Sequence, residues 1–275
     1  MSSARAFAKI NLALVVGPRR GDGKHEVVTL LQQIELHDTI ALSPADALGV
    51  DGFEDDTIVR SALESLARAS GEGSRWHVHI EKRIPVAAGL GGGSSDAATS
   101  LALANDTLES PLSADVLHRL AADVGADVPF FLQGGSCLAT GDGSELSRAD
   151  LPTAYAIVLV VPHDEVKTST AAVYAAFDQR DGAAGFGARA ARLRDAMTGV
   201  AGPRDLAALP PNDLASSPVA RELESAGAFR ADVSGAGPTV YGLFEDEPLA
   251  ASAASKLAAL GETFVTRPLA AGERS

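Results

Sequence analysis

The sequence predicts an α+β protein built in two halves. Strand-like and helix-like stretches follow one another without the strict alternation that a doubly wound parallel sheet requires. A polar, turn-rich stretch at 141–152 (GDGSELSRADLP) marks a boundary, and a strongly apolar run at 155–161 follows it. Aromatic residues make up only 5% of the 275 residues, so we expect a core of Ala, Val and Leu in which helices pack closely on sheets. We therefore place one domain at 1–152 and a second at 153–275.

Eight stretches have the apolar patterns of strands. Residues 4–16 and 76–82 alternate between side chains of two kinds, as a strand with one buried face does, whereas 155–161 is continuously apolar, as a strand buried on both faces is. In chain order, the predicted strands are 4–16, 33–42, 76–82, 136–139, 155–161, 231–233, 239–244 and 263–267.

Apolar residues at helical spacing, together with start signals, predict seven helices. Asp56 stands directly before the first helix and Ser113 opens the third, and both are residue types that accept hydrogen bonds from a helix's free N–H groups. Ser217 precedes Pro218, which fits the first helical position because proline has no N–H to satisfy there. The predicted helices are 57–69, 94–108, 113–124, 170–177, 188–197, 218–226 and 248–260.

Charge and cysteine content exclude several classes of protein. The formal net charge of −13 repels nucleic-acid backbones and acidic lipid surfaces, so we expect neither as a partner. The most apolar run, at 154–161, is too short to cross a bilayer, and the N-terminal residues lack the order of a signal peptide. The single cysteine, Cys137, excludes an internal disulfide and a Cys-rich zinc site, and it fits the reducing cytoplasm, where we expect the protein to be. We expect the Cys137 side chain to be a small, buried, apolar group rather than a nucleophile.

The most informative segment is a glycine-rich loop that precedes a long Ala-rich helix. Glycines at 89 and 91–93 allow a backbone to approach a ligand closely, and the start of the helix aims free N–H groups and a positive dipole end at the same place. Together they form a cradle for anions, most naturally phosphates; a loop that merely turns the chain is the alternative. The residues assigned to phosphate binding are Pro85, Val86, Ala87, Ala88, Gly89, Leu90, Gly91, Gly92, Gly93, Ser94 and Ser95.

This loop fits neither common template for nucleotide binding. The GxxxxGK[ST] loop needs a Gly-Lys pair, but the pair at Gly23 and Lys24 has no glycine at position 18. The GxGxxG pattern also fails, because Ser94 and Asp96 occupy the positions where its last glycine would stand. A P-loop ATPase and a Rossmann dehydrogenase are therefore not supported.

The loop resembles the central motif of the GHMP kinases, the superfamily of galactokinase, homoserine kinase, mevalonate kinase and phosphomevalonate kinase. Two further segments resemble the first and third motifs of that superfamily, AKINL at 8–12 and VSGAGPTV at 233–240. The resemblance implies an α+β fold of two domains, one like ribosomal protein S5 domain 2 and one ferredoxin-like, with the active site in the cleft between them.

Within the superfamily, the chain resembles the kinases that act on a cytidine-diphosphate-linked methylerythritol in the non-mevalonate isoprenoid pathway. The segments that carry this resemblance are AKINLAL (8–14), GDGKHEV (21–27), PVAAGLGGGSSDAA (85–98), GADVPFFL (125–132) and PNDL (211–214). It implies phosphorylation of the acceptor's 2-hydroxyl, with ATP as donor. It also implies Mg²⁺ carried by ATP, with the Ser95 hydroxyl as the candidate protein contact, in a protein that is a monomer or homodimer.

The resemblance carries two catalytic roles onto this chain. Asp127 would accept the proton of the attacking hydroxyl, and Lys9 would be its cationic partner and steady the moving phosphoryl group. On the residues alone, a turn or helix-end carboxylate is the favoured role of Asp127, because Gly125 precedes it and Pro129 follows, and only the resemblance reverses that preference. Lys9 and Asn11 alternate with apolar neighbours, so they share one face of their strand, as a pair lining a site would.

The acceptor-binding residues are also implied by the resemblance. His25 is the expected contact with the cytosine edge, and Tyr174 is one aromatic face for the base. Lys24 stands where the family usually has the other aromatic residue, so it would cover the base with its methylene stem or meet a diphosphate oxygen. The full set is Asn11, Lys24, His25, Thr170, Tyr174, Ser234, Gly235 and Gly237. The last three belong to the third motif and would meet the phosphates or the acceptor; a tight turn before the strand at 239–244 is the alternative.

Two other readings of the sequence remain open. Lys24 favours a GHMP kinase with a different acceptor, such as mevalonate, homoserine or a sugar, and a catalytically silent ligand-binding protein on the same scaffold is the second. The presence of both Lys9 and Asp127 argues against the silent protein. Separately, His77 and His79 share a strand face, but no third ligand stands at a fixed spacing, so we expect a solvated face rather than a metal site.

Overall fold

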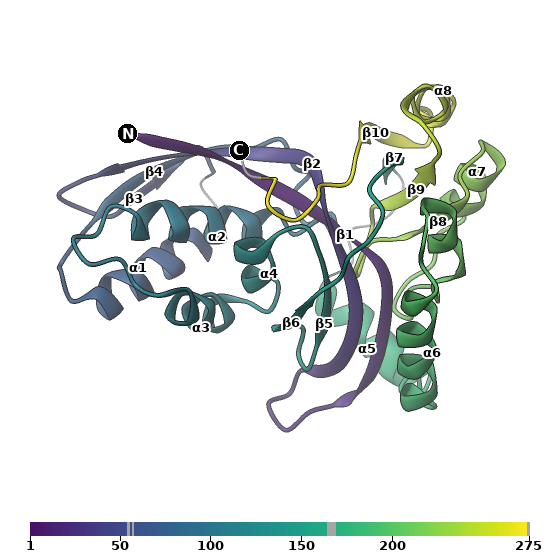
Figure 1. The fold of residues 1–275 in the computed structure, drawn as a ribbon, viewed down its shortest axis with the longest axis horizontal. Helices are drawn as coiled ribbons and strands as arrows, with labels where there is room; N and C mark the ends of the chain where they lie inside the picture. Colours follow the sequence, from purple (N-terminus) through teal and green to yellow (C-terminus); the bar gives the residue numbers. More distant parts are fainter. Residues whose placement is uncertain (54–55, 57, 164–168, 274–275) are drawn as a thin grey trace.

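A computed structural model describes residues 1–53, 56, 58–163 and 169–273 of the chain. Two antiparallel-rich sheets form two lobes, and a long hairpin of two strands runs from the first lobe toward the second (Figure 1). The hairpin consists of β1 (Ser2–Arg19) and β2 (His25–Pro44). Among the described residues, no helix is both long and apolar enough to cross a membrane.

The first sheet is built around β2, which pairs with three other strands. Its order is β3-β4-β2-β5-β6, and β1 pairs with β2 in addition. The added strands are β3 (Gly49–Asp51), β4 (Trp76–Glu81), β5 (Ser136–Thr140) and β6 (Glu145–Arg148). In β4, Trp76, Val78 and Ile80 are buried and the residues between them are exposed, which is the predicted alternation.

Four helices pack on the first sheet and close its core. They are α1 (Ile58–Ser70), α2 (Gly92–Asn105), α3 (Ala114–Val124) and α4 (Val128–Gln133). Asp56 accepts hydrogen bonds from the N–H groups of Val59 and Arg60, which is the predicted start signal of α1. Residue 57, which begins this helix in the sequence-based prediction, lies outside the described residues. Helix α2 is nearly all small residues, so Ala97, Ala98 and Leu101 pack tightly against the sheet.

The second sheet has the strand order β10-β7-β9-β8, with every neighbouring pair antiparallel. Its strands are β7 (Ala156–Pro162), β8 (Arg230–Val233), β9 (Val240–Phe244) and β10 (Gly261–Thr266). The helices of this half are α5 (Thr170–Gln179), α6 (Phe186–Thr198), α7 (Val219–Ser225) and α8 (Glu247–Leu257). Helices between the first and second and between the third and fourth strands give the βαββαβ order of a ferredoxin-like unit, which confirms that expectation.

The two lobes share one apolar core. Ile10 and Leu12 of β1 lie in the same buried cluster as Leu159 of β7 and Leu243 of β9, and α6 packs on β1. The chain passes from the first sheet to the second after β6 ends at Arg148 and before β7 begins at Ala156. The domain boundary between residues 152 and 153 falls in this connection and stays a prediction.

Several elements differ from the sequence-based expectation. Strand β2 begins at His25 rather than at 33, because its continuous apolar run is buried between neighbours and does not alternate. Helix α2 begins at Gly92, two residues before the predicted start, and has a left-handed glycine, Gly91, as its N-cap. Short elements with little pattern of their own were not predicted: β3, β6, α4 and the 3₁₀ helix Pro203–Ala208.

Candidate functional site

Strand β1 places Lys9 and Asn11 side by side on one buried face. Both side chains are at most 5% exposed, and the Lys9 Nζ donates a hydrogen bond to the Asn11 Oδ1 at 2.7 Å. The Asn11 Nδ2 donates to the Thr29 Oγ1 at 2.8 Å, and the Thr29 hydroxyl in turn donates to the carbonyl of Ala13. This chain of donors fixes which way the Asn11 amide points, so its oxygen faces the ammonium group.

Asp127 stands at the start of α4 and faces Lys9. Its Oδ2 lies 3.6 Å from the Lys9 Nζ, and its side chain is 40% exposed whereas that of Lys9 is 5% exposed. Pro129 occupies the first turn of α4, where a missing N–H costs no hydrogen bond. Although Asp127 is the N-cap residue, its carboxylate makes no capping hydrogen bond, so it remains available to a ligand.

The first glycine-rich loop lies against the same part of β1. The backbone N–H of Lys9 donates to the carbonyl of Leu90 at 3.0 Å. Gly89 and Gly91 have φ values of +82° and +71°, which favour glycine. A Cβ on Gly91 would also lie 2.7 Å from the Phe131 ring and 3.2 Å from the Lys9 Cε, so the loop can sit this close to Lys9 only without a side chain there.

Helix α2 begins directly behind this loop and presents its N-terminus to it. The first N–H groups of a helix have no acceptor within the helix, and the N-cap, Gly91, has no side chain to supply one. These groups and the helix dipole together suit an anion such as a phosphate. Of the two predicted hydroxyls, that of Ser94 is half-buried, whereas Ser95 is 1% exposed and its N–H donates to the carbonyl of Gly91.

A second glycine-rich loop, residues 234–238, closes over the first. The Ser234 hydroxyl donates to the carbonyl of Gly89 at 2.9 Å and accepts from the backbone N–H of Asn11 at 3.3 Å. A Cβ on Gly235 would lie 3.3 Å from the Asn11 Oδ1 and 3.5 Å from the Lys9 Nζ. Three segments that are far apart in the sequence therefore meet around Lys9 and Asn11. Gly237, with φ +78°, ends the turn of this loop.

His25 and Tyr174 form a second group of predicted residues. Their ring centroids lie 4.7 Å apart with a tilt of 31°, and the His25 Nε2 is 2.7 Å from the Asp178 Oδ1. Burial, with a smaller contribution from the charge of Asp127, raises the pKa of the Tyr174 phenol to about 12. The phenol therefore stays neutral and lies within electrostatic reach of the Asp127 carboxylate. Thr170 is at the exposed first turn of α5.

Lys24 makes an ion pair within the first lobe. Its Nζ lies 2.5 Å from the Asp142 Oδ2, although the Lys24 side chain is half exposed. Partial burial raises the pKa of Asp142, but hydrogen bonds from Lys24 and Ser144 outweigh it and lower that pKa to about 2. The ammonium group that was expected to meet the acceptor is thus neutralised by a carboxylate at neutral pH.

Two residues without a predicted role, Asn212 and Asp178, complete the site. The Asn212 Nδ2 donates to the carbonyls of Val233 and Gly235, at 2.9 and 2.7 Å, and so holds the second glycine-rich loop. Asp178 orients His25. The PNDL segment pointed to Asn212 without a role, whereas Asp178 had no signal because it lies 153 residues from its partner.

A buried ion cluster lies under the first turns of α2. The Lys82 Nζ is 2.5 Å from the Asp38 Oδ2 and 2.8 Å from the Asp96 Oδ2, and Asp38 also accepts from the backbone N–H groups of Arg83 and Ile84. The cluster thus ties the chain entering the first glycine-rich loop to the helix that leaves it. Desolvation, only partly offset by Lys82, raises the pKa of Asp96 to about 8.

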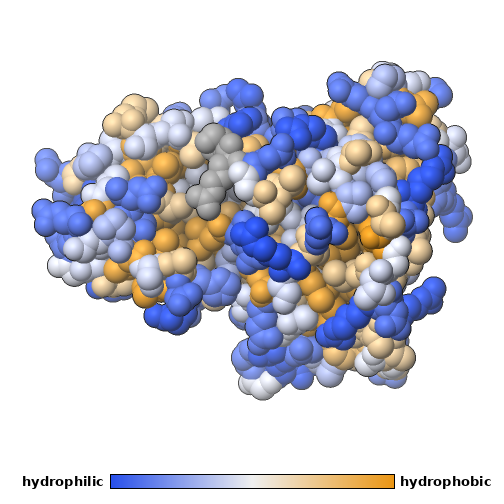
Figure 2. All heavy atoms as spheres, viewed as in Figure 1, coloured by the Kyte–Doolittle hydropathy of each residue, from blue (hydrophilic) through white to orange (hydrophobic). Residues whose placement is uncertain are grey.

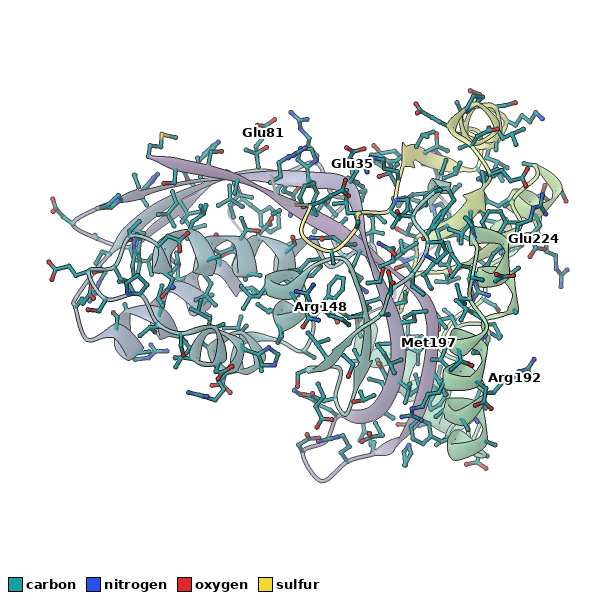
Figure 3. All side chains as sticks on the ribbon, viewed as in Figure 1. Glu35, Glu81, Arg148, Arg192, Met197 and Glu224 are labelled. Carbon is teal, nitrogen blue, oxygen red and sulfur yellow. The ribbon has the colours of Figure 1, made fainter. Side chains whose placement is uncertain are left out.

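A separate cavity of about 680 Å³ opens between α2, α3, α4 and the C-terminal residues. Its lining includes Ser95, Phe131 and Arg148, but neither Lys9 nor Asp127. Figure 2 shows apolar side chains gathered on the face over these helices, and Figure 3 shows Arg148 of β6 near the middle of that view. The cavity therefore does not include the Lys9 and Asp127 pair, although Ser95, one of the residues predicted to bind phosphate, lines it.

His77 and His79 lie on the exposed face of β4, as the alternation predicted. Asp51 of β3 contacts both rings, with its Oδ2 3.2 Å from the His77 Nε2 and its Oδ1 close to the His79 Nδ1. Within the part of the chain that the structure describes, no group of three or more His, Cys, Asp or Glu side chains is arranged to hold a metal ion.

Comparisons with known proteins match both halves of the chain. The model of the GHMP kinases N terminal domain matches residues 57–135, and that of the GHMP kinases C terminal matches residues 210–263. A 4-diphosphocytidyl-2-C-methyl-D-erythritol kinase from Chlorobaculum parvum is 35% identical over 96% of this chain and 96% of its own length. The kinase of the same name from Geobacter sulfurreducens is 38% identical over 93% of this chain and 94% of its own length.

Solved structures agree with these matches. A crystal structure of 4-(cytidine 5'-diphospho)-2C-methyl-D-erythritol kinase superposes with a TM-score of 0.78 at 29% identity and covers 97% of this chain and 99% of its own. A mevalonate kinase structure, at 13% identity and a TM-score of 0.75, shares the fold over 98% of this chain and 100% of its own. The chain therefore belongs to the GHMP kinases, and within them to the family of the 4-diphosphocytidyl-2-C-methyl-D-erythritol kinases.

Proposed function

We propose that this chain transfers the γ-phosphoryl group of ATP to the 2-hydroxyl of 4-diphosphocytidyl-2-C-methyl-D-erythritol. The observation that carries the proposal is the contact of Lys9 with both Asn11 and Asp127 at the junction of two glycine-rich loops. Relatives that match nearly the whole chain bear the name of this kinase, which supports the choice of acceptor.

The phosphate groups of ATP fit the N-terminus of α2 and the first glycine-rich loop. Gly89 and Gly91, both with positive φ, turn the loop directly before α2, whose first backbone N–H groups are donors for a phosphate. A phosphoryl group held there lies next to Lys9, because the Leu90 carbonyl is bound to the Lys9 N–H. Mg²⁺ bound to the phosphates would neutralise part of their charge, and Ser94 offers the more accessible hydroxyl of the two serines.

The reaction needs positioning and charge stabilisation more than covalent chemistry. The acceptor oxygen forms a bond to the γ-phosphorus while the bond from that phosphorus to the β,γ-bridging oxygen breaks, and ADP leaves. Asp127 accepts the proton of the acceptor hydroxyl, and the Lys9 ammonium stabilises the charge on the moving phosphoryl group. Asn11 holds the Lys9 ammonium and orients the acceptor.

The acceptor's base fits the side of the site formed by His25 and Tyr174. His25 is held by Asp178, so one ring nitrogen is committed and the other edge can meet a cytosine. Lys24 is paired with Asp142, so in our proposal it does not contact the acceptor's diphosphate. Small-molecule partners, rather than nucleic acid, agree with the net charge of −13.

The test is an acceptor panel in an ADP-release assay. Purified protein, ATP and Mg²⁺ are incubated with the cytidylylated acceptor, mevalonate, homoserine or galactose, and the phosphorylated product is identified by mass and by the position of the new ester. We expect acceptor-dependent ADP release with the cytidylylated compound alone. Turnover of mevalonate or homoserine, with no turnover of the cytidylylated compound, would overturn the proposed acceptor. Equal ADP release with and without every acceptor would indicate a catalytically silent protein on the same scaffold.

A further inference from the structure

Strand β1 has an outer edge, the edge away from β2. In the middle of the strand, the residues whose backbone groups point to this edge change from odd-numbered to even-numbered. Upstream, the odd-numbered residues Lys9 and Asn11 direct their backbone N–H groups to that edge. Downstream, the even-numbered residues Leu12, Leu14 and Val16 use the same edge for their hydrogen bonds. Neighbouring residues of a regular strand point their backbone groups to opposite edges, so this change requires one extra residue.

That extra residue is Leu12. The pairing with β2 advances from Asn11 opposite Leu31 to Ala13 opposite Leu30, which leaves Leu12 without a register partner. Such a β-bulge bends the strand and re-aims the side chains beside it. The bulge therefore decides how Lys9 and Asn11, directly upstream, point relative to the rest of the strand.

The carbonyl of Leu12 is held by two side chains from the second sheet. The Arg230 Nη2 of β8 donates to it at 2.7 Å, and the Tyr241 hydroxyl of β9 donates at 3.1 Å. Both side chains are buried, with Arg230 at 7% and Tyr241 at 0% exposure. Two buried donors on one carbonyl fix the bulge in place, because water cannot replace them when they are removed.

Arg230 uses the whole fork of its guanidinium in this position. Its Nη1 donates to the carbonyl of Leu209 at 2.7 Å, a second bond from Nη2 reaches Pro210 at 3.0 Å, and the Nε donates to the Tyr241 Oη at 3.2 Å. Its charge is balanced by the Asp232 carboxylate at 3.3 Å. A lysine has neither the planar fork nor the number of donors to make these bonds.

The same network continues to the second glycine-rich loop. The Asp232 Oδ2 accepts from the backbone N–H of Asn212 at 2.9 Å, and the Asn212 Nδ2 donates to the carbonyl of Gly235 at 2.7 Å. A Cβ on Gly235 would lie within 3.5 Å of both Asn11 and Lys9. The path that leaves β1 at the bulge returns to it through the neighbouring Ser234, whose hydroxyl accepts from the Asn11 N–H at 3.3 Å.

We propose that Arg230 is a positioning residue for the reaction at Lys9 and Asp127. It fixes the β1 bulge at Leu12 directly and the second glycine-rich loop through Asp232. The strand that carries Lys9 and the loop that lies against it are therefore both held in place. Arg230 itself touches neither reacting group; it acts through the backbone of β1. The proposal rests on the kinase activity proposed above.

The test separates positioning from stability with four variants. Arg230→Met removes the fork, Arg230→Lys keeps only the charge, and Tyr241→Phe removes one hydroxyl from a buried ring. Arg204→Met is the control, because Arg204 is an exposed arginine of the same half that pairs with the exposed Glu245. All variants are assayed at temperatures well below their thermal unfolding midpoints, and activity is expressed per folded molecule.

We expect kcat to fall about 100-fold in Arg230→Met and Arg230→Lys and about tenfold in Tyr241→Phe, because small misplacements of reacting groups cost rate. The KM for ATP should change by no more than about twofold, since the Ser234 hydrogen bond that fastens the second loop to the first stays in place in these variants. The control should keep the wild-type kcat. Wild-type kcat in the folded variants would overturn the proposal, as would a loss that only follows the folded fraction; if Arg230→Met does not fold, Tyr241→Phe decides.

A measurement without turnover distinguishes this proposal from the proposed function. Hydrogen exchange of peptides that span residues 10–13 should accelerate in Tyr241→Phe and Arg230→Met, whereas peptides from β4 should exchange as in the wild type. Unchanged exchange at 10–13 would contradict the role of Arg230 in holding the bulge. A wild-type protein with no acceptor-dependent turnover but faster exchange in the variants would contradict the kinase function instead.

Discussion

Ser234 donates its hydroxyl proton to the carbonyl of Gly89 at 2.9 Å, so one glycine-rich loop is fastened directly onto the other. The same hydroxyl accepts the backbone N–H of Asn11 at 3.3 Å. A single buried oxygen, with its residue at 0% exposure, therefore joins the two loops and the strand that carries Lys9. In the proposed function, the phosphoryl group would therefore move beside a junction of three segments rather than beside any one of them.

Replacing this hydroxyl should loosen both loops at once. In Ser234→Ala, the carbonyl of Gly89 and the N–H of Asn11 lose their buried partner, which costs about 1–3 kcal/mol for each unsatisfied group. We expect the KM for ATP to rise and kcat to fall, each by about tenfold, in steady-state assays with both substrates varied. Ser252→Ala, at an exposed serine of α8, should behave as the wild type. Unchanged constants in Ser234→Ala would show that the junction does not govern the loops.

The Asp127 carboxylate is the proposed proton acceptor. Asp127→Asn keeps the size of the side chain and its place at the start of α4, but an amide cannot take the proton of the acceptor hydroxyl. We expect kcat to fall by about 10²–10⁴-fold while the affinity for a non-hydrolysable ATP analogue, measured by calorimetry, stays within about twofold.

Lys9→Ala should give a loss of turnover of similar size, because it removes the charge that Asp127 faces at 3.6 Å. Asp123→Asn, at an exposed carboxylate of α3, serves as the matched control for Asp127→Asn. Near-normal rates in both Asp127→Asn and Lys9→Ala would remove this pair from the mechanism.

The sequence predicted the parts of the site that have a local pattern. Alternation in β1 placed Lys9 and Asn11 on one face, and glycine clustering placed a loop before a helix, because both patterns are set by neighbours in the chain. Alternation alone did not reveal the bulge at Leu12, since its partners, Arg230 and Tyr241, lie more than 200 residues away.

Elements held by tertiary contacts were the ones that escaped prediction. Helix α4 has six residues, too few for a helical period, and forms because Val128 and Phe130 are buried against the first lobe. Lys24 had two predicted roles toward the acceptor, but it pairs with Asp142, which follows it by 118 residues and carries no sequence signal. Sequence patterns predict helices, strands and the residues that share a face of each. Which distant charged side chains pair with one another depends on the folded chain.

Asp178 should matter for the acceptor and not for ATP. Its Oδ1 is 2.7 Å from the His25 Nε2, so Asp178→Asn removes the charge that orients the ring beside Tyr174. We expect the KM for the cytidylylated acceptor to rise about tenfold, with the KM for ATP unchanged, in assays that vary each substrate in turn. Asp195→Asn, at an exposed aspartate of α6, is the control. A rise in the KM for ATP alone would contradict the assignment of His25 to the acceptor.

The buried cluster beneath α2 predicts how stability depends on pH. Desolvation raises the pKa of Asp96 to about 8, well above its ordinary value, so the folded protein binds a proton at Asp96 that the unfolded chain has already released by about pH 5. This stabilising contribution is present at low pH and is lost as the pH rises through the folded pKa. The free energy of unfolding should therefore fall, from this group, by about 1.4 kcal/mol per pH unit between about pH 5 and 8.

Asp96→Asn removes the carboxyl group that binds this proton and keeps a neutral polar group beside Lys82. The free energies of unfolding of the wild type and the variant are measured in urea at several pH values. As the pH rises, the variant should lose less unfolding free energy than the wild type. Asp106→Asn, at the exposed C-terminal end of the same helix, should leave the slope of the wild type unchanged. Parallel pH profiles for Asp96→Asn and the wild type would mean that Asp96 is ionised in the folded protein, with Lys82 neutralising it more fully than its burial allows.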